Sequence, residues 1–168
     1  MSHTRSAKHR CGWSQGSELM IAYHDREWGV PVHEDRKLFE FMVLDAFQAG
    51  LSWAIVLRKR EAFREAFDNF EASRIAGYRS RKVTSLLKNP GIIRNRQKIA
   101  AAVGNARAFL EIQDANGSFD RFIWQFTGGT TKHNTWKTMK QVPPHTRESD
   151  AMSEALIERG CKFVGSTI

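Results

Sequence analysis

Apolar residues recur with a helical period along most of the chain, most clearly after residue 37. Leu38, Phe41 and Met42 are three or four positions apart, which places them on one face of a helix. Asp45 follows at the same spacing, so the pattern predicts a carboxylate on the apolar face rather than on the solvated one. Asp45 is therefore a candidate site residue.

The helical pattern breaks over residues 48–53 and then resumes. Gly50 is typical of a helix end, Leu51 is predicted to be exposed, and Ser52 is typical of the N-cap of a new helix. Trp53 then stands in the first turn of that helix. A carboxylate on an apolar face, a tight turn with a projecting leucine and an indole at a helix start thus lie close together, which predicts a binding site.

The same periodicity and the same start and stop signals predict the remaining elements. Helices are expected over residues 18–27, 35–49, 53–68, 70–76, 81–88, 95–112 and 119–126, and from a cap at Ser149 to Arg159. Gly and Pro residues at 29–31 and 89–91 predict turns. Residues 127–147 predict an irregular connection with patches of strand propensity but no alternation. The fold class is therefore all-α, with about eight helices.

Length and composition leave room for one domain with a proper core, or for two small helical lobes that share one. The chain has 168 residues, of which 41% are hydrophobic. No run approaches the roughly eighteen apolar residues of a membrane span, and the first ten residues lack the apolar core of a signal peptide. Cys11 and Cys161 are the only cysteines, which argues against a disulfide framework and for a reducing, cytoplasmic location.

The chain is strongly basic, with a formal net charge of +8 and a pI near 9.9. This excess favours polyanionic partners, nucleic acid above all and acidic membrane surfaces less, although a merely basic soluble protein has the same composition. Residues 1–10 are polar and basic, and we expect them to form a flexible arm before a single domain over residues 11–168.

Residues 87–99, LKNPGIIRNRQKI, join two predicted helices through a glycine-containing hairpin. The start of the second helix offers unpaired N–H groups and a partial positive charge, which suit a phosphate. Arg94, Arg96 and Lys98 follow directly, so the segment is a candidate binding site for a nucleic-acid backbone. An ordinary helix–helix turn with a solvated charged face explains the pattern equally well.

Large aromatic side chains stand near Asp45 in the sequence: Trp13, Tyr23, Trp28 and Trp53. Flat aromatic walls around one hydrogen-bond acceptor are what a nucleobase pocket requires. The alternative is structural, with Asp45 capping a helix or pairing with an arginine and the aromatic residues filling a core. That alternative suits the phenylalanines of the chain better than indoles at helix ends.

Cys11 and His24 carry a thiol and an imidazole, both of which bind zinc, and His9 and Cys161 are the other candidate ligands. Two ligands do not make a four-coordinate site, and the sequence has no Cys-x-x-Cys pair. By pattern alone, a buried free thiol and a surface histidine are the favoured interpretation.

Taken together, these residues resemble the DNA-3-methyladenine glycosylase I family, a branch of the helix-hairpin-helix glycosylases. The resemblance covers nearly the whole chain through short motifs in the right order: Cys11-Gly12-Trp13, Ala22-Tyr23-His24-Asp25, Glu27-Trp28-Gly29-Val30-Pro31, Gln48 to Trp53, Lys59-Arg60-Glu61, Gly91-Ile92-Ile93-Arg94, Lys98-Ile99, Gly104-Asn105-Ala106 and Lys162-Phe163-Val164-Gly165. It implies a helix-hairpin-helix glycosylase fold in two small lobes. It also implies a DNA-repair activity, the removal of 3-methyladenine from alkylated DNA by hydrolysis of its N-glycosidic bond, without lyase chemistry.

The resemblance assigns roles to individual residues. The residues that would stack on or wall the flipped base are Tyr23, Trp53, Trp28, Trp13 and Met20. The wedge that enters the duplex would be Gly50 and Leu51. The hairpin that binds phosphate through backbone amides would be Pro90, Gly91, Ile92 and Ile93.

Asp45 stands where the family typically has a glutamate that hydrogen-bonds the edge of the methylated adenine. Asp45 is therefore the candidate catalytic residue, either through this recognition, which is the favoured role, or by stabilising the oxocarbenium-like sugar or positioning water. The carboxylate is one methylene shorter here, so a tighter pocket, a bridging water or an altered base selectivity would follow. Met20 and Phe47 also depart from the polar or aromatic residues expected at their positions.

The resemblance further implies a structural zinc, with Cys11 and His24 as two of four ligands and a histidine and a cysteine after Ile168 as the others. The family domain is therefore expected to continue past that residue. No organic cofactor is implied, and the expected protein is a monomer that binds double-stranded DNA and no membrane. Two rival hypotheses are a non-catalytic module that binds alkylated DNA and a plain basic DNA-binding domain without a base pocket.

Overall fold

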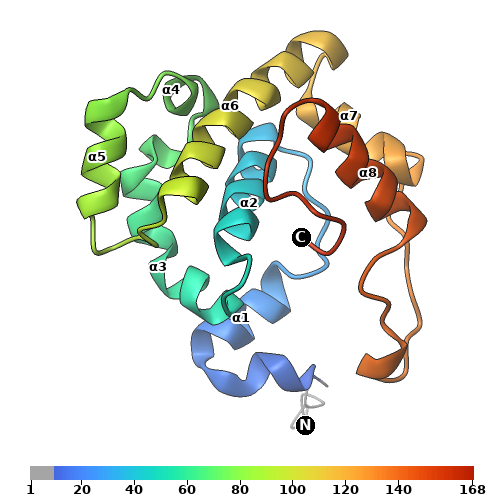
Figure 1. The fold of residues 1–168 in the computed structure, drawn as a ribbon. Coiled ribbons are helices and arrows are strands. Elements are labelled where there is room, and N and C mark those ends of the chain that lie inside the picture. Colours follow the sequence, from blue (N-terminus) through green and yellow to red (C-terminus); the bar gives the residue numbers. More distant parts are fainter. Residues whose placement is uncertain (1–9) are drawn as a thin grey trace, which may run out of the picture. The chain divides into compact units, whose positions relative to one another are not determined.

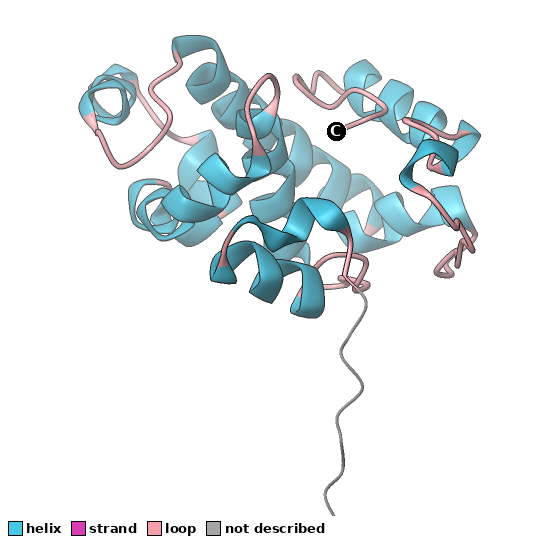
Figure 2. Ribbon diagram, turned by 90° about the horizontal axis from the view of Figure 1, so that it is seen from below, coloured by secondary structure: helices cyan, strands magenta, loops and turns pink. Residues whose placement is uncertain are grey.

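The computed structural model describes residues 10–168. Within them the chain folds into α-helices and short 3-10 turns and contains no strand, which confirms the all-α prediction (Figures 1 and 2). No helix in this part of the chain is both long and apolar enough to cross a bilayer. The chain divides into two compact units after Pro31. The arm predicted for residues 1–10 lies outside the described residues, except for Arg10.

The first unit consists of a 3-10 turn, η1 (Gly12–Gly16), and the helix α1 (Glu18–Arg26). The Ser17 hydroxyl accepts a hydrogen bond from the Met20 N–H at 3.2 Å, which satisfies one of the open donors at the helix start. Gly29 has a φ of 73°, a left-handed value that favours glycine, and the chain turns away from the helix there. The predicted start of this helix is confirmed, and the helix ends at Arg26, one residue before the predicted end.

The second unit, residues 32–168, holds seven helices (Figure 1). They are α2 (Asp35–Gln48), α3 (Trp53–Ala66), α4 (Ala72–Ala76), α5 (Ser80–Lys88), α6 (Arg96–Asn116), α7 (Phe119–Trp124) and α8 (Arg147–Glu158). Their connections include the 3-10 turns η2 (Asp68–Phe70), η3 (Gln125–Thr127) and η4 (Met139–Gln141). The long helices α2 and α6 pack against each other, with α4 and α5 beside α6 and with α7 beside both long helices.

Phenylalanine side chains join these helices into one hydrophobic core. Phe39 of α2 packs on Phe109 of α6 with ring centroids 4.8 Å apart, and Phe47 of α2 packs on Phe63 of α3 at the same distance. All four side chains are buried. Full burial of one such side chain stabilises the fold by about 1.5–3 kcal/mol. These contacts therefore fix α2 against both α3 and α6.

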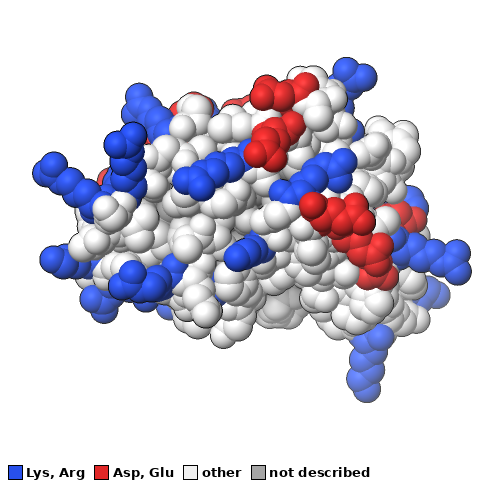
Figure 3. Space-filling view, turned by 45° about the horizontal axis from the view of Figure 1, so that its top comes forward, with Lys and Arg blue, Asp and Glu red and all other residues white. Residues whose placement is uncertain are grey.

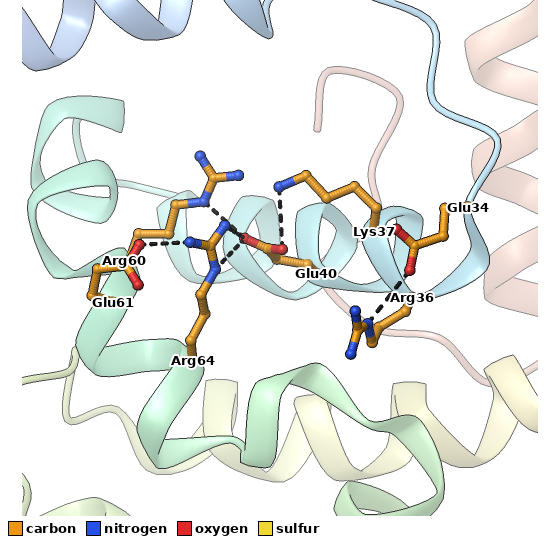
Figure 4. A network of polar contacts seen from close by, with 7 residues as sticks. All are labelled: Glu34, Arg36, Lys37, Glu40, Arg60, Glu61 and Arg64. Carbon is orange, nitrogen blue, oxygen red and sulfur yellow. Dashed lines mark hydrogen bonds and ion pairs between the residues drawn. The ribbon is translucent and has the colours of Figure 1, made fainter.

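A buried ion pair also ties α2 to α3 (Figure 4). Arg60 Nε donates to Glu40 Oε1 at 2.8 Å, and both residues are 7% exposed. Arg64 and Lys37 donate to the same carboxylate at 2.8 and 3.2 Å. Burial opposes ionisation of Glu40, but the three cations outweigh it and hold the pKa of Glu40 below its usual value. Because α2 ends and α3 begins at the break predicted as a site, this cluster fixes the two helix ends relative to each other.

The cap predicted for the last helix was wrong by three residues. The Thr146 and Ser149 side chains each accept a hydrogen bond from the backbone N–H of the other, at 3.3 and 2.8 Å. In this capping box Thr146 is the N-cap and Ser149 lies inside the first turn, so the helix starts at Arg147.

Two other predicted boundaries were wrong near η2. The helix from Trp53 ends at Ala66 rather than at Asp68, and the next helix starts at Ala72 rather than at Phe70. Residues 68–70 have φ values between 49° and 56°, a left-handed conformation through which a right-handed helix cannot continue. The connection over residues 127–147 forms η4 and no strand, despite its patches of strand propensity.

Candidate active site

Asp45 lines a cavity of about 270 Å³ within the second unit. Leu38, Phe41 and Met42 of α2 form one part of the lining, and the remainder comes from α7, α8 and residues 164–168. Apart from Asp45 and three serines, the side chains that line it are apolar. Small-molecule pockets span about 300–1,000 Å³, so this cavity suits one small heterocycle rather than a larger ligand. The prediction that Asp45 lies on the apolar face of its helix is confirmed.

Burial raises the pKa of Asp45 from 3.8 to about 7. Within residues 10–168 no charged partner offsets this effect, so the structural alternative of an acid paired with an arginine does not apply. At neutral pH the group is divided between the acid and the carboxylate, and it can either donate or accept a hydrogen bond. A carboxyl perturbed in this way inside a cavity is typical of functional sites.

A buried amide holds the wall of the cavity that residues 164–166 form. Asn105 of α6 donates from Nδ2 to the Lys162 carbonyl at 3.0 Å, and its Oδ1 accepts from the Lys162 N–H at 2.8 Å. Asn105 is fully buried, so loss of its amide would leave both Lys162 groups without these partners. The sequence offered no role for this pair, because its members are far apart in the chain.

The break after α2 forms a tight turn that presents Leu51. Gly50 has a φ of 78°, a left-handed value that favours glycine. Gln48 holds the turn twice, because its carbonyl accepts from the Leu51 N–H and its Nε2 donates to the Leu51 carbonyl, each at 2.6 Å. The Leu51 side chain is 38% exposed, although leucine is usually buried. A leucine held outward in this way suits the predicted wedge.

Lys98 lies in a different place from the one predicted for it. Its side chain is 6% exposed and does not join the surface cations that precede it in the hairpin. Its ammonium donates to the carbonyls of Phe47 and Ala49, at the C-terminal end of α2, at 2.8 and 2.5 Å. The negative end of the helix dipole attracts a cation there, while burial lowers the pKa of Lys98. The expectation that Lys98 contacts a nucleic-acid backbone is therefore corrected, since Lys98 fixes the end of α2 next to Gly50.

The hairpin between α5 and α6 is held from α3. Lys59 Nζ donates to the carbonyls of Pro90 and Gly91, at 2.9 and 3.1 Å. These two carbonyls are thus occupied by an ammonium, which leaves the hairpin with a positive rather than a negative local charge.

Gly91 lies close to α3. A Cβ at this position would lie 3.0 Å from the Cβ of Ala62 and 3.0 Å from Oδ1 of Asn89, which is too close for ordinary contacts. Asn89 Oδ1 already accepts the Gly91 N–H at 2.8 Å. The hairpin amides left for a phosphate are those of Ile92 and Ile93, which no hydrogen bond within residues 10–168 uses.

In the first unit the predicted aromatic residues lie together. Trp13 packs edge-on against Trp28 with ring centroids 5.3 Å apart, and its centroid is 6.4 Å from that of Tyr23. Trp28 also stacks on His24 at 5.5 Å, yet it is 51% exposed. Met20 differs from these residues because it is buried. The cluster offers a half-exposed indole face to a ligand.

Cys11 and His24 are neighbours, and the described part of the chain brings no further ligands to them. The Cys11 N–H donates to His24 Nε2 at 3.4 Å, and His24 Nδ1 contacts Asp25 Oδ1 at 3.1 Å. Among residues 10–168 no group of three or more His, Cys, Asp or Glu residues is placed to hold a metal ion. Burial raises the pKa of the Cys161 thiol to about 11, which disfavours the thiolate that zinc binds, and His9 lies outside the described residues. The described donors therefore do not fit a four-ligand zinc site.

Trp53 stands in the first turn of α3, as predicted, and packs against the hydrophobic core rather than lining the Asp45 cavity. Ser52 precedes it with the extended backbone of an N-cap, but the Ser52 hydroxyl makes no capping hydrogen bond. Gln48, Lys59 and Asn105 hold parts of the site, and sequence reasoning assigned none of them a role. Their presence in the motifs of the family resemblance was the only available signal.

Comparison with known proteins finds relatives over nearly the full chain. The family model for methyladenine glycosylase matches residues 13–168. DNA-3-methyladenine glycosylase 1 of Escherichia coli (strain K12) is 45% identical over 159 residues, which are 95% of this chain and 85% of that protein. A crystal structure of 3-methyladenine DNA glycosylase I has a TM-score of 0.92 and 46% identity, over 95% of this chain and 87% of that one. The Staphylococcus aureus 3-methyladenine DNA glycosylase I, in a structure that concerns its recognition of 3-methyladenine, has a TM-score of 0.90 and 31% identity, over 94% and 84% of the two chains.

Proposed function

Because this chain belongs to the methyladenine glycosylase family, we propose that it excises 3-methyladenine from alkylated DNA by hydrolysing the bond between the base and its deoxyribose. The observation that carries this proposal is the single carboxyl of Asp45 in an apolar cavity suited to one heterocycle. A base inside a duplex reaches such a cavity only after it leaves the stack, so the reaction includes flipping of the target nucleotide.

The charge of the substrate explains why one carboxyl suffices. Methylation at N3 makes the purine cationic, so the electron pair of the breaking C1′–N9 bond neutralises the base, which leaves as neutral 3-methyladenine. Water adds its hydroxyl to C1′ and releases one proton, which leaves an abasic deoxyribose. No acid is needed to protonate the leaving base. Flipping, stacking and edge recognition then provide most of the selection.

Asp45 recognises the base in this proposal. Adenine presents an exocyclic amino group as a donor, and a carboxylate accepts it. The cationic ring also favours the ionised form of a nearby acid, so binding of the substrate lowers the pKa of Asp45 from about 7. In the apolar cavity this attraction is stronger than in water. Because the side chain is one methylene shorter than glutamate, the base lies closer to α2 or is bonded through a water.

Aromatic residues of each unit are proposed, on the family resemblance, as stacking partners of the flipped base, although none of them lines the Asp45 cavity. They are Trp53 in the second unit and Tyr23, Trp13 and Trp28 in the first. An electron-poor cationic ring is attracted by the faces of indole and phenol rings. The half-exposed Trp28 in its cluster with Trp13 supports this role.

The turn after α2 acts on the duplex. Leu51 fills the gap that the flipped nucleotide leaves, and Gly50 lets the turn approach the DNA closely. The hydrogen bonds of Gln48 and Lys98 around this turn support the role, because a wedge must keep its position against a base stack.

The hairpin binds the DNA backbone. The N–H groups of Ile92 and Ile93 and the positive end of the α6 dipole suit one phosphate, as the helix start predicts. Arg94 and Arg96 are exposed and add charge-assisted contacts to the neighbouring phosphates.

The reaction stops at the abasic site in this proposal. A lyase step needs a free amine at C1′, and no lysine among residues 10–168 lines the Asp45 cavity. The protein acts as a monomer on double-stranded chromosomal DNA inside the cell.

The test is release of the free base. The protein is incubated with DNA treated with a methylating agent, and the released bases are separated by chromatography, with 3-methyladenine expected and little 7-methylguanine. Asp45→Asn should slow single-turnover excision by about 100-fold or more, the usual effect of removing one polar group that acts in the transition state. Unchanged excision would remove Asp45 from the site. Tight binding of alkylated DNA without any base release would instead identify a non-catalytic binding module.

A further inference from the structure

The net positive charge of the protein comes from one stretch of chain. Residues 72–110 contain nine lysines and arginines and no acidic residue, whereas the rest of the chain contains 17 basic and 18 acidic residues. This stretch forms α4, α5, the hairpin and most of α6. In Figure 3 a group of Lys and Arg side chains lies on the side where Figure 1 draws α5, while the other Lys and Arg side chains lie nearer to the visible acidic ones. The excess of positive over negative charge therefore comes from this stretch of the chain.

α5 carries a shallow groove along its outward face. Two hollows share Arg81 and Ser85, and one of them reaches back to Gly77 while the other reaches forward to Pro90 in the hairpin. The groove thus follows the whole helix, a length of about 14 Å at 1.5 Å per residue. No acidic residue lines either hollow. The groove is continuous with the segment already proposed to bind phosphate.

Two cations of this groove, Arg81 and Lys88, have no ion-pair partner among the described residues. Arg81, Ser85 and Lys88 are four and three positions apart, so they share one face of α5, and all three are exposed. Lys82 lies 3.2 Å from Asp68 and is neutralised by it. Within residues 10–168 neither Arg81 nor Lys88 forms an ion pair, so both are available to an outside anion.

We propose that this face of α5 is a second binding site for the DNA backbone, occupied by phosphates of the same duplex beyond the hairpin. The inference rests on the proposed function, because the hairpin determines where the duplex lies. The solvated face of an ordinary helix carries both signs of charge, whereas the charged residues that line this one are all cations. Phosphates of one strand follow each other every 3.4 Å or so along the axis, so a groove of about 14 Å faces several of them. Contacts of this kind position the protein without reading sequence.

The test compares two double variants that remove the same charge. Arg81→Gln with Lys88→Gln changes the groove, and Lys137→Gln with Lys140→Gln changes the exposed connection between α7 and α8. Binding to a short undamaged duplex is measured over a range of KCl concentrations. Each phosphate contact makes the plot of log K against log salt steeper by about 0.9. The two lost cations of the groove variant should therefore reduce the steepness of this slope by about 2, and the control variant should leave the slope unchanged. Both variants should melt near the wild-type temperature, because all four side chains are exposed.

Excision separates this proposal from the proposed function. At saturating enzyme both variants should release base in a single turnover at the wild-type rate, since neither pair lines the Asp45 cavity. An unchanged slope for the groove variant, or an equal loss in the control, overturns the proposal. Normal base release with an unchanged slope would refute the groove alone. A reduced slope without base release by the wild type would refute the glycosylase and leave the groove as a DNA-binding surface.

Discussion

The Asp45 carboxyl weakens the fold at neutral pH, and Asp45→Asn should therefore stabilise the protein. In the unfolded chain the group has its ordinary pKa of 3.8, and burial in the folded protein raises the pKa to about 7. Because the folded pKa is the higher one, the folded state holds the proton more tightly, and this contribution to stability is largest in acid. It is lost as the pH rises from about 4 to about 7 and is fully lost above that range.

The magnitude follows from the shift. One pKa unit corresponds to about 1.4 kcal/mol, so the full loss is about 4 kcal/mol. Roughly 1.5–2 kcal/mol of this is already lost at about pH 5, which leaves roughly 2–3 kcal/mol to be lost between about pH 5 and about pH 8. Asparagine has nearly the same size and does not ionise, so the stability of Asp45→Asn does not fall with pH through this group. Its advantage in the free energy of unfolding should grow by that amount over this range, or by about 5–10 °C in melting temperature.

Urea unfolding of both proteins over this pH range measures the effect. Asp114→Asn removes the same charge from an exposed position in α6 and controls for the change in net charge. Parallel stability profiles for the wild type and Asp45→Asn would refute the reasoning, because they would mean that the carboxyl is as well hydrated in the folded protein as in the unfolded one. A variant that is more stable and yet excises poorly would show that Asp45 is retained for function at a cost in stability.

Three further predictions concern Lys98, Gly91 and the pH dependence of excision. Lys98→Met should lower the free energy of unfolding by about 1–3 kcal/mol, because it leaves the carbonyls of Phe47 and Ala49 without their hydrogen-bond donor. The variant should also slow excision at saturating DNA more than it weakens DNA binding. Lys98→Arg should recover part of that rate, and a variant that loses stability at an unchanged rate would contradict the link to the turn at Leu51. Gly91→Ala should weaken DNA binding in a gel-shift titration without slowing saturated excision, because the new Cβ would meet Ala62 at 3.0 Å and displace the hairpin; unaltered affinity would exclude the hairpin as a contact. In pH profiles of excision, kcat/KM should rise through about pH 7, and kcat should rise at lower pH, because the cationic substrate lowers the pKa of Asp45.

The sequence by itself determined the helical elements and the local features of the site. The spacing of apolar residues and the residues typical of helix starts and ends predict the helices, because these signals depend only on neighbours within a few positions. For that reason Asp45 could be placed on the apolar face of α2, and Gly50 could be placed at a helix end. The motifs also indicated the family, because they recur in order over almost the whole chain.

Tertiary structure decided where charges and polar groups find their partners. Lys98 follows two exposed cations in the sequence, yet its ammonium is buried at the end of α2, because the carbonyls it bonds lie about fifty residues earlier in the chain. Asn105 and Lys162 pair in the same way over 57 positions. Thr146 and Ser149 are both good caps, and only the folded backbone distinguished them. Local patterns specify helices, whereas burial and long-range hydrogen bonds depend on which helices meet, and that is a property of the whole fold.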